Sequence, residues 1–240
     1  MLQNIKELCG WKIAASDGDI GHVKDFYFDD KTWVIRHLVV NTGSWLTGRH
    51  VLISPHAFGK LDSREKTLHL KLHKKQIEDS PSLESHKQIS RPYEMEYYRY
   101  YGWPAYWNAG AAGISGGPVV LSPSKDERVA HRQHPHQDDK HLQSAKGVIG
   151  YHIEATDGTI GHVTGLMAED KNWAIRELVV ETGHWYSGKE ILISPDKIER
   201  ISYEEFGVFV NLTKADIQRT GENDFAKAGR GSHGAENFHD

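Results

Sequence analysis

The chain has 240 residues, a formal net charge of −4 at pH 7 and a sequence pI near 6.5, which gives no reason to expect a nucleic-acid interface. Its single cysteine, Cys9, excludes an intrachain disulfide and a cysteine-based metal cage. No apolar run of membrane-spanning length and no signal peptide is apparent, so we expect a soluble, cytoplasmic protein with no membrane-spanning segment.

Two stretches of the chain repeat each other at a constant distance of 140 positions. The octapeptide Ser16–Val23 returns as Thr156–Val163, and the same offset carries Trp33 onto Trp173. From position 10 to position 61, roughly half of the residues recur without a gap, which indicates a duplicated domain. We expect two small domains at 1–80 and 147–220, a linker at 81–146 and a flexible tail at 221–240.

The two repeats differ in charge. Positions 10–79 contain 11 Lys/Arg and 9 Asp/Glu, a balance of +2, whereas positions 150–219 contain 7 and 12, a balance of −5. Opposite charge could let the two domains attract each other or face different partners, and neutral drift of the surface explains it equally well.

Each repeat is predicted to consist of short strands. Asp17-Gly18 between two strand-like runs is typical of a hairpin, because glycine accepts the positive φ of the turn. In the second repeat, Thr213 is the expected N-cap of a helix, three residues before Asp216. The pattern favours an all-β fold of two small β-barrels, each with a short helix. The expected strands of the first repeat are Trp11–Ala15, Ile20–Phe28, Trp33–Val40, Arg49–Ile53 and Leu68–Leu72, followed by a helix over Lys74–Asp79.

The linker begins with an aromatic segment. Tyr93–Trp107 holds eight aromatic residues in fifteen, whereas disordered linkers are normally poor in aromatics. The segment is therefore expected either to pack on a barrel or to bind a partner. The rest of the linker is polar and rich in histidine, with His131, His134, His136 and His141.

The repeated motifs resemble those of the PRC-barrel domain family. They are Asp-Gly-x-Ile-Gly-His-Val, Trp-x-Ile-Arg-x-Leu-Val-Val, Thr-Gly-x-Trp-x-x-Gly and Leu-Ile-Ser-Pro, and the likeness covers roughly residues 5–80 and 145–220. The family includes the cytoplasmic domain of the photosynthetic reaction-centre H subunit and the C-terminal domain of a ribosome-maturation factor, and the central Tyr-Tyr-Arg-Tyr-Tyr-Gly-Trp-Pro run is similar to one in uncharacterised bacterial tandem members. The resemblance implies a small barrel that mainly binds other proteins.

Catalytic chemistry finds little support in the sequence. His22 and His162 recur at one position, but without a nucleophile and an orienting group they are better explained as structural residues. The turn carboxylates Asp17 and Asp157 are expected to bond their own backbone. We therefore predict that the protein is not an enzyme and uses no cofactor.

The leading hypothesis is a non-catalytic protein-binding or scaffold module, with contacts between the barrels or between copies of the chain and an unidentified protein partner. A metal or small-ligand sensor that uses the histidines is the first alternative. A ribosome- or RNA-associated factor is the second, by analogy of family alone. The expected partner-binding residues are aromatic: Trp45, Trp185, Tyr97, Tyr98, Tyr100, Tyr101, Trp103, Trp107 and Phe209.

Overall fold

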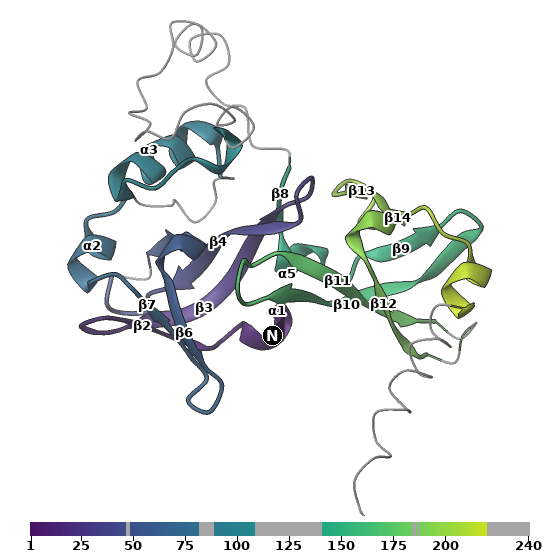
Figure 1. Ribbon diagram of the computed structural model, residues 1–240, viewed down its shortest axis with the longest axis horizontal. Helices are drawn as coiled ribbons and strands as arrows, with labels where there is room; N and C mark the ends of the chain where they lie inside the picture. The colour runs from purple at the N-terminus through teal and green to yellow at the C-terminus, as the bar shows by residue number, and fades with distance from the viewer. Residues whose placement is uncertain (47–48, 82–88, 109–140, 184–185, 187, 220–240) are drawn as a thin grey trace, which may run out of the picture. The chain divides into compact units, whose positions relative to one another are not determined.

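The computed structural model describes residues 1–46, 49–81, 89–108, 141–183, 186 and 188–219 (Figure 1). The chain forms two compact units. The N-terminal unit consists of Leu8–Asp29 and Ile35–Gln143, and the C-terminal unit consists of Met1–Glu7, Asp30–Val34 and Ser144–Asp240.

Each unit is built on a mixed seven-stranded sheet, and the two sheets have the same strand order. The first sheet runs β5-β4-β3-β2-β7-β6, with β8 paired to β3. Its strands are β2 (Lys12–Ala15), β3 (Gly18–Asp29), β4 (Val34–Asn41), β5 (His50–Ile53), β6 (Phe58–Asp62), β7 (Thr67–Leu70) and β8 (Leu142–Ser144). In this sheet β2 and β7 are parallel neighbours.

The second sheet runs β12-β11-β10-β9-β14-β13, with β1 paired to β10. Its strands are β1 (Leu2–Asn4), β9 (His152–Ala155), β10 (Gly158–Glu169), β11 (Ile175–Thr182), β12 (Glu190–Ile193), β13 (Ile198–Ser202) and β14 (Gly207–Val210). The tip of the β3–β4 hairpin also belongs to this unit, where the Ile175 amide donates to the Trp33 carbonyl at 2.7 Å.

Short helices connect the strands. They are α1 (Ile5–Leu8), α2 (Lys74–Glu78), α3 (Arg91–Tyr101), α5 (Ala145–Val148) and the 3-10 turns η1 (Pro55–Ala57), η2 (Tyr106–Asn108) and η4 (Pro195–Lys197). Within the described parts of the chain, none of the helices is long and apolar enough to cross a membrane.

The predicted strands of the first repeat are confirmed, and the described fold is mostly β. All five strands expected in the first repeat are present within a few residues of their predicted ends, and α2 lies where the short helix was expected. Strands β6 and β8, and the lead-in strand β1, were missed. Among the described strands, hydrogen bonding follows an open path in each sheet and does not close it into a barrel.

The lead strands of the two repeats are exchanged. Strand β1 precedes the first repeat but pairs antiparallel with β10, aligning Leu2 with Glu169 and Asn4 with Met167. Strand β8 precedes the second repeat but pairs with β3. Each sheet is therefore completed by three residues that lie next to the other repeat in the sequence.

Replacing either exchanged strand with three glycines should weaken the sheet that receives it, because glycine packs no side chain and weakens a strand. We expect Leu2–Asn4 replacement to increase amide hydrogen exchange in β10 and to leave β3 unchanged. Replacing Leu142–Ser144 should do the reverse. Hydrogen exchange followed by mass spectrometry reads both sheets in one experiment, and equal exchange in β3 and β10 in either variant would contradict the pairing.

Two glycines lie where neighbouring strands approach most closely. Gly21 in β3 has φ +145°, and a Cβ built there would overlap the carbonyl oxygen of Asn41 in β4. Gly161 in β10 has φ +159° and the same relation to Glu181 in β11. The backbones of the paired strands can approach each other this closely only because glycine has no side chain at the position.

The hairpin carboxylates cap helices instead of bonding their own turn. Asp17 Oδ1 accepts from the Lys74 amide at 2.8 Å, and Asp157 Oδ1 accepts from the Lys214 amide at 2.9 Å. The sequence-based expectation for these two residues was wrong, because a turn carboxylate competes equally well for an orphan donor at a helix N-terminus. The expected cap at Thr213 is confirmed by the Asp216 amide, which donates to Thr213 Oγ1 at 3.2 Å.

Candidate functional site

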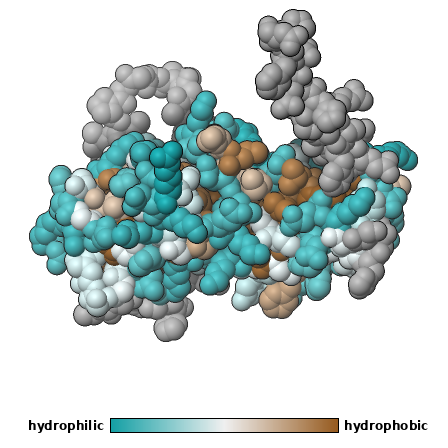
Figure 2. Space-filling model, turned by 90° about the horizontal axis from the view of Figure 1, so that it is seen from below, coloured by the Kyte–Doolittle hydropathy of each residue, from teal (hydrophilic) through white to brown (hydrophobic). Residues whose placement is uncertain are grey.

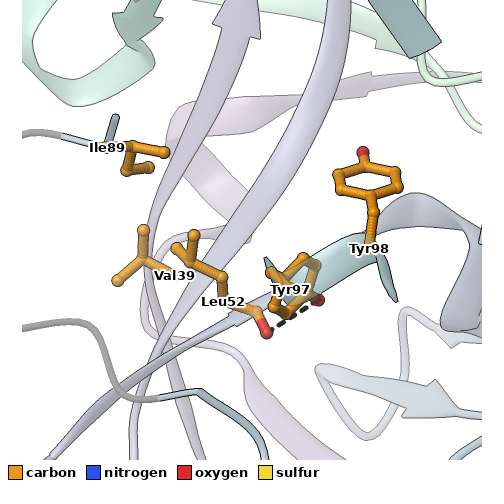
Figure 3. Close-up of a cluster of buried hydrophobic side chains, with 5 residues drawn as sticks. All are labelled: Val39, Leu52, Ile89, Tyr97 and Tyr98. Carbon is orange, nitrogen blue, oxygen red and sulfur yellow. Dashed lines mark hydrogen bonds between the residues drawn. The ribbon is translucent and has the colours of Figure 1, made fainter. Parts of the chain in front are cut away.

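The aromatic segment folds into helix α3 and packs on the outward face of the first sheet. Ser90 is the N-cap of α3, a proline occupies its first turn, and Gly102 ends it in the left-handed conformation at φ +68°. Tyr97 and Tyr98 meet Val39 of β4 and Leu52 of β5 in a buried cluster, shown in Figure 3. This face, formed by the outward side chains of β4 and β5, is called the helix seat below.

Tyr97 joins α3 to the edge of the sheet. Strand β5 is the last strand of its sheet path, so no other described strand pairs with the outer side of its backbone. The Tyr97 hydroxyl donates to the Leu52 carbonyl at 2.9 Å, the dashed bond in Figure 3, and accepts from the Ser54 amide at 2.9 Å. One hydroxyl therefore satisfies two backbone groups that the docked helix takes out of water.

A polar cluster centred on the buried Glu94 carboxylate lies beneath the helix. The side chains of His37 in β4 and Glu94 in α3 are both 0 % exposed, and His37 Nε2 lies 2.8 Å from Glu94 Oε1. The Tyr106 hydroxyl donates to the same oxygen at 2.8 Å, and Arg91 Nη1 lies 2.9 Å from Glu94 Oε2. Because a buried carboxylate without partners is very costly, these contacts determine where α3 sits.

Two guanidinium groups cover the aromatic rings at this end of the seat. The Arg36 guanidinium carbon lies 4.1 Å from the centre of the Tyr106 ring, and that of Arg91 lies 4.4 Å from the centre of the Trp107 ring. Such cation–π contacts favour arginine over planar rings. In the second repeat, Arg176 stands at the position of Arg36 and pairs with Glu169 on the surface, at 2.6 Å.

Burial changes the acidity of the tyrosines in the seat. Desolvation raises the pKa of Tyr98 to about 12, although a hydrogen bond from Ser54 and the nearby Arg36 and Arg91 charges act against it. Desolvation likewise raises the pKa of Tyr101 to about 12. Neutral phenols are therefore strongly preferred in the docked state.

Docking of α3 should fail in alkali. Because the folded-state pKa values of Tyr98 and Tyr101 lie above the ordinary value of 10, their stabilising contribution is complete below pH 10 and is lost as pH rises through about 12. Phenolate absorbance should then rise in an early and a late step, and Tyr98→Phe should shrink the late step. A single step at the ordinary pKa in the folded protein would contradict this prediction.

The predicted contact residues of the aromatic segment differ in accessibility. Tyr97 and Tyr98 are buried, at 0 % and 2 % exposure, whereas Tyr100 is 42 % exposed. Tyr101 and Trp103 are partly buried and stacked, with ring centres 4.3 Å apart. Trp107 is partly buried under Arg91. Of the two alternatives for this segment, packing on the sheet is the one observed.

The remaining predicted contact residues lie away from the helix seat. Trp45 is partly buried, with Lys74 Nζ 4.8 Å from its ring centre. Phe209 lies in β14 under Arg200, whose guanidinium carbon is 3.5 Å from its ring centre. Trp185 lies outside the described residues. Among the predicted contact residues that the structure describes, those of the aromatic segment Tyr93–Trp107 are the ones brought together.

Histidines do not assemble a metal centre in the described residues. His22 and His162 are both exposed, and His162 Nε2 lies 3.7 Å from Glu181 Oε2. The linker residues His131, His134 and His136 lie outside the described ranges. Where side chains are described, no group of three or more His, Cys, Asp or Glu could hold a metal ion.

The C-terminal unit presents the same sheet face without an equivalent helix among its described residues. Leu192 in β12 is 40 % exposed, whereas its counterpart Leu52 is 1 % exposed. Ser194 is exposed where Ser54 is buried. The outward side chains of β11 and β12 are here called the counterpart face, in which Leu192 is exposed at the edge and Val179 is buried at 9 % exposure.

Sequence reasoning missed His37 and Glu94, the residues on which the seat depends. Both are polar residues at positions where burial was not expected, and Glu94 lies within the aromatic segment, whose tyrosines and tryptophans were the predicted contact residues. A comparison of the two repeats does contain a signal for His37. His37 is replaced by Glu177 in the second repeat, within a strand where the surrounding residues are largely retained, which indicates a change of environment on that face.

The first repeat matches a known family. A family model for the PRC-barrel domain matches residues 3–77, which covers all strands of the first sheet except β8. No curated protein matches the chain. With its second β-rich unit of the same strand order, the chain is consistent with tandem PRC-type domains, the first of which matches the family model over residues 3–77.

Proposed function

We propose that this protein is a non-catalytic protein-binding or scaffold module built from two PRC-type barrels in tandem. The observation that carries the proposal is the difference between the helix seat and the counterpart face. In one unit a helix of the chain covers the face, whereas in the other the described residues form no equivalent helix and Leu192 is 40 % exposed.

The helix seat illustrates what such a face can bind. It holds α3 through apolar contact with Val39 and Leu52, through the edge hydrogen bonds of Tyr97 and through the buried Glu94 pair. An apolar centre that is surrounded by directional polar contacts is typical of protein recognition sites. A face of this kind binds a folded element rather than positioning reactive groups around a substrate.

Cross-linking in the native cell tests the proposal. A photoreactive residue placed at exposed positions of either unit, followed by affinity capture and mass spectrometry, should repeatedly recover one protein other than the chain itself. The same residue at a buried position, such as Leu38 at 0 % exposure, serves as the control. Cross-links confined to the chain or to a second copy of it would overturn the protein-binding function.

A further inference from the structure

The exchanged strands β1 and β8 belong to two short arms that differ in side-chain size. The first arm is residues 2–5, strand β1 with the residue after it, and the second arm is residues 142–145, which extends β8 in the same way. Both arms begin with Leu-Gln, and the two residues that follow are larger in the first: Asn4 and Ile5 against Ser144 and Ala145. Ile5 is 0 % exposed and Ala145 is 1 % exposed, so their surroundings must match the difference in volume.

The strands that receive the arms differ in the opposite sense. The first arm pairs with β10, where Gln3 is aligned with Ala168. The 140-residue repeat equates positions 165–168 of β10 with positions 25–28 of β3, the strand that receives β8. The two stretches have the same burial pattern, but β10 reads Gly-Leu-Met-Ala where β3 reads Asp-Phe-Tyr-Phe. The larger arm therefore lies on a strand of smaller residues, and the smaller arm on a strand of larger residues.

The contact between Asn4 and Gly165 shows this match in atomic detail. A Cβ built on Gly165 would lie 3.0 Å from Asn4 Oδ1 and 3.1 Å from Asn4 Nδ2, so the Asn4 side chain occupies the space beside the glycine. Asn4 Oδ1 also accepts a hydrogen bond from the Lys6 amide at 3.0 Å, which holds the side chain in this position. The φ of Gly165 lies outside the left-handed region, so the missing side chain serves packing and not backbone conformation. In β3 the corresponding residue is Asp25, which is buried at 9 % exposure.

The arrangement without exchange would fit poorly in both sheets. The first arm on β3 would bring Asn4 against Asp25 and overpack the contact. The second arm on β10 would bring Ser144 beside Gly165 and leave unfilled volume. Figure 2 shows a largely hydrophilic surface with hydrophobic side chains in patches, whereas both receiving stretches are mostly buried, so packing volume and not surface polarity determines the fit.

We propose that matched side-chain size assigns each arm to the receiving strand of the other repeat. Asn4 with Gly165, and Ser144 with Asp25, are the specificity-determining pairs of this interaction. Strand β10 is a binding surface for the larger arm, and β3 is a binding surface for the smaller one. The two repeats are therefore a heterotypic pair and not two interchangeable copies, because each arm is disfavoured on its own repeat by overpacking or by a cavity.

Placing the β3 residue in β10 tests the first pair in the full chain. Gly165→Asp should increase amide hydrogen exchange in β1 and in the part of β10 that pairs with it by about tenfold, because the contact becomes overpacked. Exchange in β3 should stay unchanged and serves as the internal control. Adding Asn4→Ser recreates the Ser144–Asp25 combination and should return exchange to within about threefold of the native value. An aspartate that destabilises β10 for any other reason would not be rescued by a smaller arm.

The second pair is tested in the same way. Ser144→Asn should increase exchange in β8 and β3 by about tenfold and leave β10 unchanged, and adding Asp25→Gly should reverse the increase. Unchanged exchange in Gly165→Asp or in Ser144→Asn, or a double variant that exchanges as fast as its single variant, would overturn the proposal.

A chain with transposed arms gives an independent readout. Leu2 and Glu169 are aligned across β1 and β10, so Leu2→Cys with Glu169→Cys should form a disulfide when the native arms are present. Transposing the arms takes four substitutions: Asn4→Ser, Ile5→Ala, Ser144→Asn and Ala145→Ile. The yield of the disulfide should then fall by about tenfold, because the first arm no longer fits β10. Peptide mapping by mass spectrometry distinguishes this bond from any bond to Cys9, and an equal yield with native and transposed arms would overturn the assignment by size.

Discussion

Glu94→Ala is expected to lower the free energy of unfolding of the N-terminal unit by about 3–5 kcal/mol, the usual cost of breaking a buried ion pair. The variant removes the carboxylate that lies 2.8 Å from His37 and 2.9 Å from Arg91. His37, which is 0 % exposed, then loses the contact that its Nε2 atom makes with Glu94. Denaturant unfolding, followed by hydrogen exchange of the β4 and α3 amides at each denaturant concentration, would measure the loss.

Two further variants distinguish the stability contributed by the buried pair from a general effect of substitution in α3. Glu96→Ala removes the same side chain from an exposed position of α3 and should change stability by less than about 0.5 kcal/mol. The double variant His37→Leu, Glu94→Leu should recover much of the loss, because two apolar side chains can replace a buried pair at little cost. If Glu94→Ala were no more destabilising than Glu96→Ala, the cluster would not hold α3 in place.

Gly21→Ala should destabilise the N-terminal unit by about 4 kcal/mol or more, which places it among the most damaging single substitutions. The new methyl group would overlap the Asn41 carbonyl and lie 2.9 Å from the Thr42 Cα, and both neighbours are backbone atoms of β4 or its end. Either β3 must separate from β4 or the φ of +145° must change. Thermal or denaturant unfolding would measure the effect.

The matched control is Gly43→Ala, in the loop after β4. Gly43 also has positive φ, at +55°, but a Cβ there meets nothing within 4 Å. Gly43→Ala should lower the free energy of unfolding by only about 1–2 kcal/mol, the cost of placing alanine in the left-handed conformation. The difference between the two variants isolates the close approach of the strands, and equal losses would show that backbone conformation alone accounts for the effect.

Most of the first sheet could be predicted because its signals are local. Hydrophobic alternation located β7, the Asp17-Gly18 turn located the β2–β3 hairpin, and the repeat extended these predictions to the second unit. The run Trp33–Val40 has apolar residues on both faces, and the structure gives the reason for the outer one: α3 covers it at His37 and Val39.

The exchanged strands could not be assigned from sequence. Leu2 and Gln3 do recur as Leu142 and Gln143, so the repeat extends further toward the N-terminus than the span first recognised. Even so, a three-residue strand has too little pattern to specify its neighbour, and backbone hydrogen bonding alone would let either sheet accept either copy. Pairing between segments distant in sequence depends on tertiary structure, which a local pattern does not contain.

Helix α3 was missed although its end signals are readable. Ser90, Pro92 and Gly102 are residues that typically begin and end helices. Tyrosine has low helix propensity, so the four tyrosines between positions 97 and 101 argued against a helix, and packing on the sheet overrides that preference. The partner-binding role assigned to these aromatic residues stays a prediction.

The exchange of β1 and β8 has a consequence for the order of synthesis. The first sheet receives its last strand only when residues 142–144 have left the ribosome, long after β7 at 67–70 has been made. At about 5–20 residues per second, the incomplete first repeat waits several seconds for that strand. During this interval the part of β3 that later pairs with β8 is open, and a strand of another nascent chain could pair with it. Chains translated on the same message are therefore at greatest risk of pairing with each other before the second repeat emerges.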